Sequence, residues 1–75
     1  MTTPPLALII DDEPDIRELL EITLQRMRID TRSAGSVAEA MLLLEKEAFN
    51  LCLADMRLPD GDGIDIVRHV TEHFP

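Results

Sequence analysis

Two short runs of apolar residues stand out along the chain, and aspartate follows each of them directly. The first run covers residues 6–10 and precedes Asp11 and Asp12, and the second covers residues 51–54 and precedes Asp55. A continuous apolar run of this length is typical of a strand that is buried on both faces of a parallel sheet. The pattern therefore predicts two buried strands that each end in acidic residues.

Apolar residues at helical spacing predict a first helix behind the first strand. Pro14 suits its first turn, because the missing N–H of proline would have no partner there. The apolar stripe of this helix consists of Ile16, Leu19, Leu20, Leu24 and Met27, with charged residues on the other face. A short and partly polar run, residues 31–34, predicts a weaker strand near an edge of the sheet.

Two further helices are predicted. Residues 36–39, Ser-Val-Ala-Glu, match a capping box, in which the serine and glutamate side chains bind amides at the start of a helix. The apolar stripe of this helix consists of Val37, Ala40, Met41 and Leu44. After the turn-rich residues 59–63, the last helix carries Ile66, Val67, Val70 and Phe74 on one side. The chain thus alternates between strand and helix from beginning to end.

This alternation, with short connections, indicates an α/β domain with a parallel sheet and right-handed crossovers. In open sheets of this kind, ligands bind beyond the carboxyl ends of the strands, at the point where the strand order reverses. The strands that end in Asp11-Asp12 and in Asp55 are expected to be neighbours at that point. Three carboxylates would then meet at one edge of the sheet.

Length and composition limit the number of domains and the possible partners. Seventy-five residues form at most one small domain, which we place at residues 6–75 behind an N-terminal tail of residues 1–5. A formal charge of −8 repels phosphate backbones and anionic lipid, so we expect no direct binding of nucleic acid or membrane by this segment. The first apolar run is too short for a signal peptide or a membrane span. Cys52 is the only cysteine, which excludes a disulfide framework and fits a reducing, cytoplasmic setting.

Carboxylates that meet at one edge repel one another, and a hard divalent cation removes this repulsion. Mg²⁺ prefers one or two carboxylates together with water and phosphate oxygens. An aspartate beside Mg²⁺ can act as a nucleophile toward phosphorus, while the metal offsets charge on the transferring group. A single aspartate in such a place is more often a helix cap or a turn residue. Two apolar strands that both end in aspartate favour the metal site instead.

Residues 9–14, Ile-Ile-Asp-Asp-Glu-Pro, and residues 53–63, Leu-Ala-Asp-Met-Arg-Leu-Pro-Asp-Gly-Asp-Gly, resemble the receiver domain of bacterial two-component response regulators. The resemblance covers residues 6–75 and is strongest to receivers that precede enhancer-binding transcription activators. It implies a flavodoxin-like, doubly wound parallel sheet, truncated to three strand–helix units with strand order 2-1-3. It also implies that a sensor histidine kinase donates a phosphoryl group from a phosphohistidine.

The resemblance implies a role for each residue of the motifs. Asp55 would accept the phosphoryl group and would also contact the metal. Asp12 would bind Mg²⁺ directly, Asp11 would hold it, usually through water, and the backbone carbonyl of Arg57 would supply another ligand. A DNA-binding output domain, if the parent protein has one, would lie in a different part of that protein.

The chain departs from the family in length. Complete receivers have five strand–helix units, a Ser or Thr after the fourth strand and a Lys after the fifth, and no residue here matches those positions. We therefore keep a second interpretation, in which the fragment is not phosphorylated and acts as a structural or dimerisation module. The open edge of the strand at residues 51–54 and the uncovered stripe of the first helix would favour self-association, unless the segment belongs to a longer chain.

A Mg²⁺-dependent phosphohydrolase with an aspartate nucleophile is the remaining alternative. Such enzymes usually carry Asp-x-Asp after the first strand, whereas here the two aspartates are adjacent and Glu13-Pro14 follows them. We therefore expect the chain to be a phosphate acceptor and not an enzyme.

Overall fold

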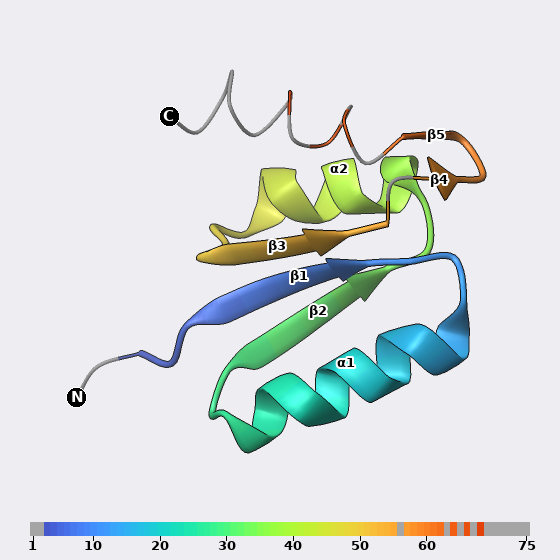
Figure 1. The fold of residues 1–75 in the computed structure, drawn as a ribbon. Helices are drawn as coiled ribbons and strands as arrows, with labels where there is room; N and C mark the ends of the chain where they lie inside the picture. The colour runs from blue at the N-terminus through green and yellow to red at the C-terminus, as the bar shows by residue number, and fades with distance from the viewer. Residues whose placement is uncertain (1–2, 56, 63, 65, 67, 69–75) are drawn as a thin grey trace.

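The computed structural model describes residues 3–55, 57–62, 64, 66 and 68. In chain order the elements are β1 (Leu6–Ile10), α1 (Pro14–Arg26), β2 (Asp30–Ala34), α2 (Val37–Lys46), β3 (Leu51–Ala54), β4 (Arg57–Leu58) and β5 (Gly61–Asp62) (Figure 1). Both apolar runs form strands with the predicted bounds. Only β1 is buried as predicted, whereas no residue of β3 is buried and Leu51 is exposed, because β3 lies at an edge of the described sheet. The backbone is helical at Ile64, Ile66 and Arg68, where we expect the third helix, while Val67, Val70 and Phe74 lie outside the described residues. Within the described residues, no helix combines the length and the apolar character that crossing a membrane requires.

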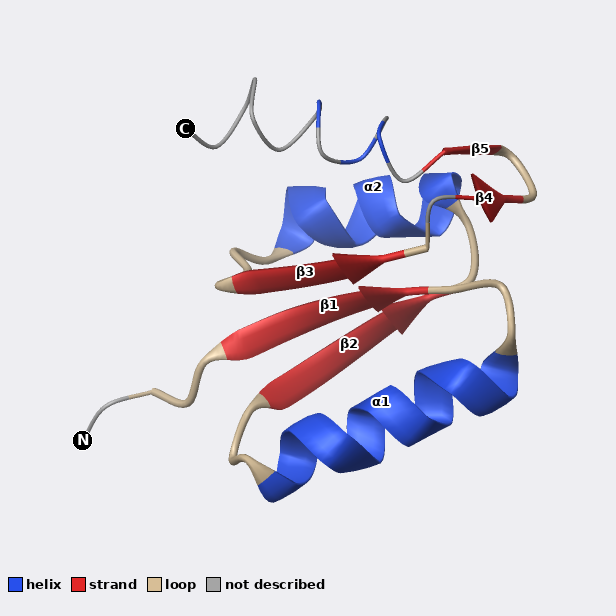
Figure 2. Cartoon of the chain, in the orientation of Figure 1, coloured by secondary structure: helices blue, strands red, loops and turns tan. Residues whose placement is uncertain are grey.

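The main sheet is parallel with the strand order β2-β1-β3, as predicted (Figure 2). β1 is the central strand, and its residues 7–10 are at most 1% exposed, which explains its unbroken apolar sequence. Asn50 joins β1 to β3 at the amino end, because its side chain accepts from the Leu6 amide at 2.9 Å and its amide donates to the Leu6 carbonyl at 2.8 Å. At the carboxyl end, the Asp55 amide donates to the Ile10 carbonyl at 2.8 Å. The register between β1 and β3 is therefore fixed at both ends.

The helices α1 and α2 cover opposite faces of the sheet (Figure 2). Successive residues of β1 point to opposite faces, so Ala7 and Ile9 pack with Leu24 of α1. The buried cluster on the α2 face consists of Leu8, Ile10, Ala34, Ala40, Leu44 and Ile66. Helices on both faces of a parallel sheet make this a doubly wound, flavodoxin-like fold.

Helix α1 buries less of its apolar stripe than the spacing predicts. Leu24 is buried and Leu20 packs beside it, but Leu19 and Met27 are 60% and 63% exposed, and Ile16 is also exposed. Leu19 lies about 100° around the helix from Leu20, and Met27 is the C-cap, past the last helical residue. Met27, which its place on the stripe suggests as a core residue, is therefore a surface residue. The expected uncovered apolar surface on this helix is confirmed.

The start of α2 differs in one detail from the predicted capping box. The Ser36 hydroxyl accepts a hydrogen bond from the Glu39 amide at 3.2 Å, as the motif requires. The Glu39 carboxylate, however, accepts from the amide of Gly35 at 2.8 Å, one residue before the N-cap. The glutamate therefore fixes the turn that leads into the helix.

A short antiparallel hairpin, formed by β4 and β5, occupies the segment for which the sequence predicts only a turn. Arg57 pairs with Asp62 and Leu58 with Gly61, and residues 59–60 form the turn between them. Leu58 also packs against the buried cluster on the α2 face. Strands of two residues are too short for an alternating pattern to appear, so the sequence displays only its turn residues.

Candidate metal and phosphoryl site

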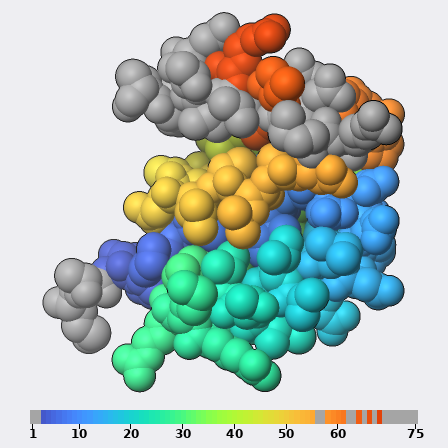
Figure 3. Space-filling view, in the orientation of Figure 1, coloured from blue at the N-terminus to red at the C-terminus, as the bar shows by residue number. Residues whose placement is uncertain are grey.

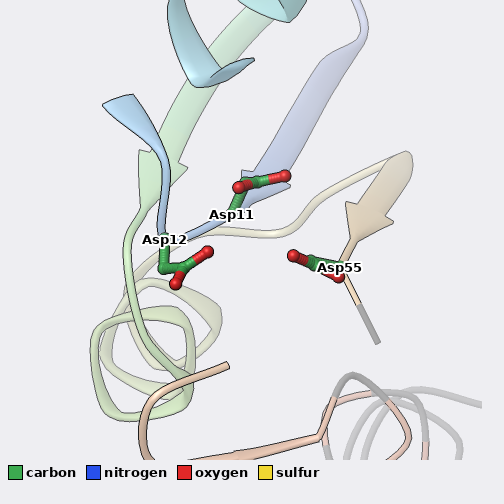
Figure 4. A group of neighbouring side chains, drawn as sticks. All are labelled: Asp11, Asp12 and Asp55. Atoms are coloured by element: carbon green, nitrogen blue, oxygen red, sulfur yellow. The ribbon is translucent and has the colours of Figure 1, made fainter. Parts of the chain in front are cut away.

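Asp11, Asp12 and Asp55 converge at the carboxyl edge of the sheet (Figure 4). Because β1 and β3 are parallel neighbours, the residues that follow them lie at the same edge. Each of the three side chains offers a carboxylate oxygen, and these oxygens all lie within 4.8 Å of one another. Asp11 and Asp55 are half-buried, and Asp12 is exposed. The structure thus brings together the three acidic residues that the sequence pattern singles out.

The cluster suits a hard divalent cation. Two carboxylates 4.8 Å apart repel each other by on the order of 1 to 3 kcal/mol, for dielectric constants between those of water and a protein surface. Oxygens that bind one Mg²⁺ at about 2.0–2.1 Å lie no more than about 4.2 Å apart, so small side-chain rotations, or a water in place of one direct ligand, would accommodate the ion. The donor set is all oxygen and negatively charged, which Mg²⁺ prefers. The residues present therefore fit this metal.

Three hydrogen bonds hold Asp11 and the loop behind it. The Asp11 amide donates to the Ala34 carbonyl at 3.1 Å, which continues the β1–β2 pairing past the end of the strand. The Asp11 side chain accepts from the Glu13 amide at 2.9 Å, and the Asp11 carbonyl accepts from Nη1 of Arg17 at 2.6 Å. The backbone that carries Asp11 and Asp12 is therefore fixed before any ligand binds, which lowers the ordering cost of binding.

Gly35 leaves room for the Arg17 side chain. A Cβ atom at residue 35 would lie 3.0 Å from Nη1 of Arg17, closer than an ordinary van der Waals contact. A Cβ atom at this position would require the guanidinium that binds the Asp11 carbonyl to shift slightly. The glycine after β2 thus supports the acidic loop after β1.

A groove opens beside the acidic cluster. Its volume is about 480 Å³, and it is lined by Ile10, Asp11, Glu13, Ile16, Leu20, Leu53, Ala54 and Asp55. Most of these residues are apolar and belong to β1, β3 and α1, and Asp11 and Asp55 of the acidic cluster are among them. The volume is within the range of ordinary ligand-binding clefts, so Asp55 can be approached from this side.

Arg57 begins β4, two positions after Asp55. The acidic cluster consists of the three aspartates, and the contribution of the Arg57 carbonyl stays a prediction. Only the backbone of Arg57 belongs to the described part of the chain, and Met56 lies outside it.

Asp60, in the turn of the β4–β5 hairpin, is a residue that the sequence pattern does not single out. Its two carboxylate oxygens accept hydrogen bonds from the amides of Val37 and Ala38 at 2.7 and 3.0 Å. These bonds, the one from Ala38 most strongly, hold the pKa of Asp60 below its usual value. In the sequence Asp60 is only an aspartate in a turn, and nothing there points to partners 22 and 23 residues away.

Cys52 behaves as a small hydrophobic residue. It lies in β3, packs against the buried cluster on the α2 face and has no disulfide partner. Burial raises the pKa of its thiol, which disfavours the reactive thiolate. We therefore interpret Cys52 as an inert packing residue of β3.

Comparison with known protein sequences supports the same interpretation of the site. A family model described as the response regulator receiver domain matches residues 7–75. The response regulator protein PilR of Pseudomonas aeruginosa is 65% identical over 69 residues, which are 92% of this chain and 16% of PilR. The transcriptional regulatory protein GltR of the same species is 38% identical over 66 residues, which are 88% of this chain and 27% of GltR. The chain therefore spans only a small part of these curated relatives.

Solved structures agree with the sequence relatives. The response regulator protein TrrA of Thermotoga maritima, in complex with Mg²⁺-BeF, matches with a TM-score of 0.88 and 27% identity, covering 93% of this chain and 61% of TrrA. Since the family match extends over nearly the whole chain and includes all three aspartates, this chain belongs to the response regulator receiver domain family.

Proposed function

We propose that this chain accepts a phosphoryl group on Asp55 from a phosphohistidine of a sensor histidine kinase, with Mg²⁺ bound beside the acceptor. The observation that carries the proposal is the meeting of three carboxylates at the ends of two parallel strands in a chain of the receiver family. Family membership supports the class of reaction, and the Mg²⁺-BeF complex of TrrA supports the choice of metal.

In the proposed transfer, Asp55 is the nucleophile. One of its carboxylate oxygens forms a bond to phosphorus, the P–N bond to the imidazole breaks, and the electron pair of that bond stays on the histidine nitrogen. Asp11, Asp12 and the backbone carbonyl of Arg57 would hold a bound cation next to Asp55. When bound, Mg²⁺ offsets the negative charge on the transferring phosphoryl oxygens. The hydrogen-bonded loop after β1 keeps Asp11 and Asp12 at the required place.

The names of the relatives and the net charge support proposals on the output of the signal and on DNA binding. PilR and GltR are regulators, and GltR is a transcriptional one, so we propose that phosphorylation here controls transcription. The charge of −8 opposes DNA binding by this segment, and an output domain would lie in another part of a longer protein. We place the exchange in the cytoplasm, where the single thiol of Cys52 stays reduced.

Incubation with acetyl phosphate and Mg²⁺, followed by measurement of the intact mass, tests the proposal. We expect one phosphoryl adduct on the unchanged chain and none on Asp55→Asn, because the amide is not a nucleophile. Asp30→Asn is the matched control. Asp30 pairs with Leu6 at the amino ends of the strands, away from the acidic cluster, so this variant should keep the adduct. An adduct that survives in Asp55→Asn would contradict the proposal.

A structural or dimerisation module is the second candidate, and the open edge of β3 favours it. Among the described strands β3 pairs with β1, and it reaches the molecular surface in Figure 3. Unpaired strand edges are templates for pairing with another chain. If the unchanged chain gains no phosphoryl group yet self-associates, this second candidate replaces the first.

We also propose that the chain does not turn over phosphate esters. The adjacent arrangement of Asp11 and Asp12 differs from the Asp-x-Asp pattern of phosphohydrolases, in which the second aspartate is the acid–base. Steady hydrolysis of a generic phosphatase substrate, lost in Asp55→Asn, would refute this part of the proposal.

A further inference from the structure

We infer that Asp60 is a positioning residue for the phosphoryl site, because it connects the hairpin that follows Asp55 to the first turn of α2. The inference rests on the proposed function, since it concerns the Mg²⁺ site that the function requires. It assigns a role to a residue outside the acidic cluster of Asp11, Asp12 and Asp55.

The connection is a two-point contact. One carboxylate oxygen of Asp60 lies 2.7 Å from the Val37 amide nitrogen, and the other lies 3.0 Å from that of Ala38. A carboxylate that binds two adjacent amides is held in both position and orientation. Its negative charge is also favoured at the N-terminus of a helix, where the peptide dipoles leave partial positive charge.

Asp60 accepts hydrogen bonds from two α2 amides that the two Ser36 groups do not bind. The first amides of a helix lack partners within the helix itself. The Ser36 side chain accepts from the amide of Glu39, and the Ser36 carbonyl accepts from that of Ala40. The amides of Val37 and Ala38 are those that Asp60 binds. The hairpin turn is therefore part of the cap of α2, and moving the turn would leave these two amides to solvent.

The hairpin in turn continues directly into the site. Asp60 lies in its turn, and β4 begins with Arg57, whose backbone carbonyl is the fourth proposed metal ligand. Leu58 anchors the same strand in the cluster on the α2 face. Because the turn closes the hairpin that begins with Arg57, a movement of the turn is passed along β4 to the Arg57 carbonyl. Asp60 thus fixes the distance between the Arg57 carbonyl and the aspartates.

A purely structural role for Asp60 is the competing explanation, since any helix cap contributes to stability. Ser36→Ala separates the two roles. It removes a cap from the same helix terminus but leaves the connection to the hairpin in place. A structural role predicts that Asp60→Asn and Ser36→Ala have parallel effects on all properties, whereas a positioning role predicts an additional effect of Asp60→Asn on the metal.

The experiment compares the unchanged chain, Asp60→Asn and Ser36→Ala by ¹⁵N NMR titration with Mg²⁺ and by amide hydrogen exchange. We expect Asp60→Asn to weaken Mg²⁺ binding by on the order of tenfold, as for other residues that orient metal ligands. We expect Ser36→Ala to change the affinity by less than about twofold, although both variants lower stability. Asp60→Asn should also speed exchange at the amides of Val37 and Ala38.

The outcomes distinguish a failure of this inference from a failure of the proposed function. Mg²⁺ affinity that Asp60→Asn leaves unchanged, or that both variants lower equally, would overturn the inference alone. The absence of Mg²⁺ binding by the unchanged chain would overturn the proposed function, and this inference with it. If Asp60→Asn fails to fold, Asp60→Glu takes its place: it keeps the charge and both oxygens but lengthens the side chain, and the same loss of affinity without loss of fold is expected.

Discussion

At the scale of single residues, Arg28 has an unusual backbone conformation. Its φ angle is 62°, in the left-handed region that normally favours glycine. The amide of Arg28 donates to the carbonyl of Gln25, and the amide of Ile29 to that of Leu24, which is the hydrogen-bond pattern of a Schellman motif. Ile29 also packs against the buried cluster that includes Leu24, and a hydrophobic contact is usual at this kind of helix end. A non-glycine residue in this conformation costs about 1–2 kcal/mol.

Replacing Arg28 with glycine should therefore stabilise the fold. We expect Arg28→Gly to raise the free energy of unfolding by about 0.5–1 kcal/mol, because relief of the left-handed conformation exceeds the entropy cost of glycine. Arg26→Gly, inside the last turn of α1, should lower it by about 1 kcal/mol. Urea denaturation followed by circular dichroism measures both variants. Since the chemical change is identical, equal effects on the two variants would contradict the backbone explanation.

The acidic residues of the site can be predicted from the sequence, whereas the contacts that hold them cannot. Asp11, Asp12 and Asp55 each follow an apolar run, so one local pattern indicates both the strand and its end. The bond from Arg17 to the Asp11 carbonyl and the bonds of Asp60 to α2 join separate elements. Such contacts depend on how the elements pack, which no local pattern encodes.

At the scale of elements, burial on both faces makes a strand easy to predict. β1 has the predicted bounds, because a strand inside a parallel sheet must be apolar along its whole length. β3 also has the predicted bounds, although it is an edge strand of the described sheet and none of its residues is buried. The apolar stripe predicts the position of α1 but not which of its residues are buried. Helical spacing does not tell how many of the stripe residues contact the sheet. The β4–β5 hairpin lacks any pattern of its own and was not predicted.

Burial also determines how much each leucine contributes to the stability of the fold. Leu8 of β1 is 0% exposed and Leu19 of α1 is 60% exposed. We expect Leu8→Ala to cost about 2–5 kcal/mol of unfolding free energy, which would abolish the cooperative transition of so small a domain. Leu19→Ala, the same change at an exposed position, should cost well under about 1 kcal/mol. Thermal and urea unfolding at low protein concentration measure both, and similar losses in the two variants would contradict the packing described here.

At the scale of the whole molecule, exposed apolar surface and net charge have opposite effects on self-association. Exposed apolar residues of α1 lie on one face, and Leu51 of the edge strand β3 is 41% exposed. Both features favour association with another chain. The formal charge of −8 opposes the approach of a second copy.

Self-association is therefore expected to depend on salt. Raising the ionic strength screens the repulsion between copies, so sedimentation velocity should show more dimer at high salt than at low salt. Leu51→Lys should weaken the association, because it places a charge on the strand edge. Leu42→Lys, at an exposed position on α2, is the matched control and should leave it unchanged. A compact monomer at every salt concentration would contradict this expectation.

The register between β1 and β3 also ties the ion to the folding of the chain. The three aspartates meet only when the first and third strands pair, so the unfolded chain has no comparable site. By mass action, an ion that binds only the native state stabilises it by about 2.7 kcal/mol when its concentration is a hundred times the dissociation constant. For a domain of this size that is a large share of the total stability. Cation binding would thus stabilise the pairing of β1 with β3, two strands that are far apart in the sequence.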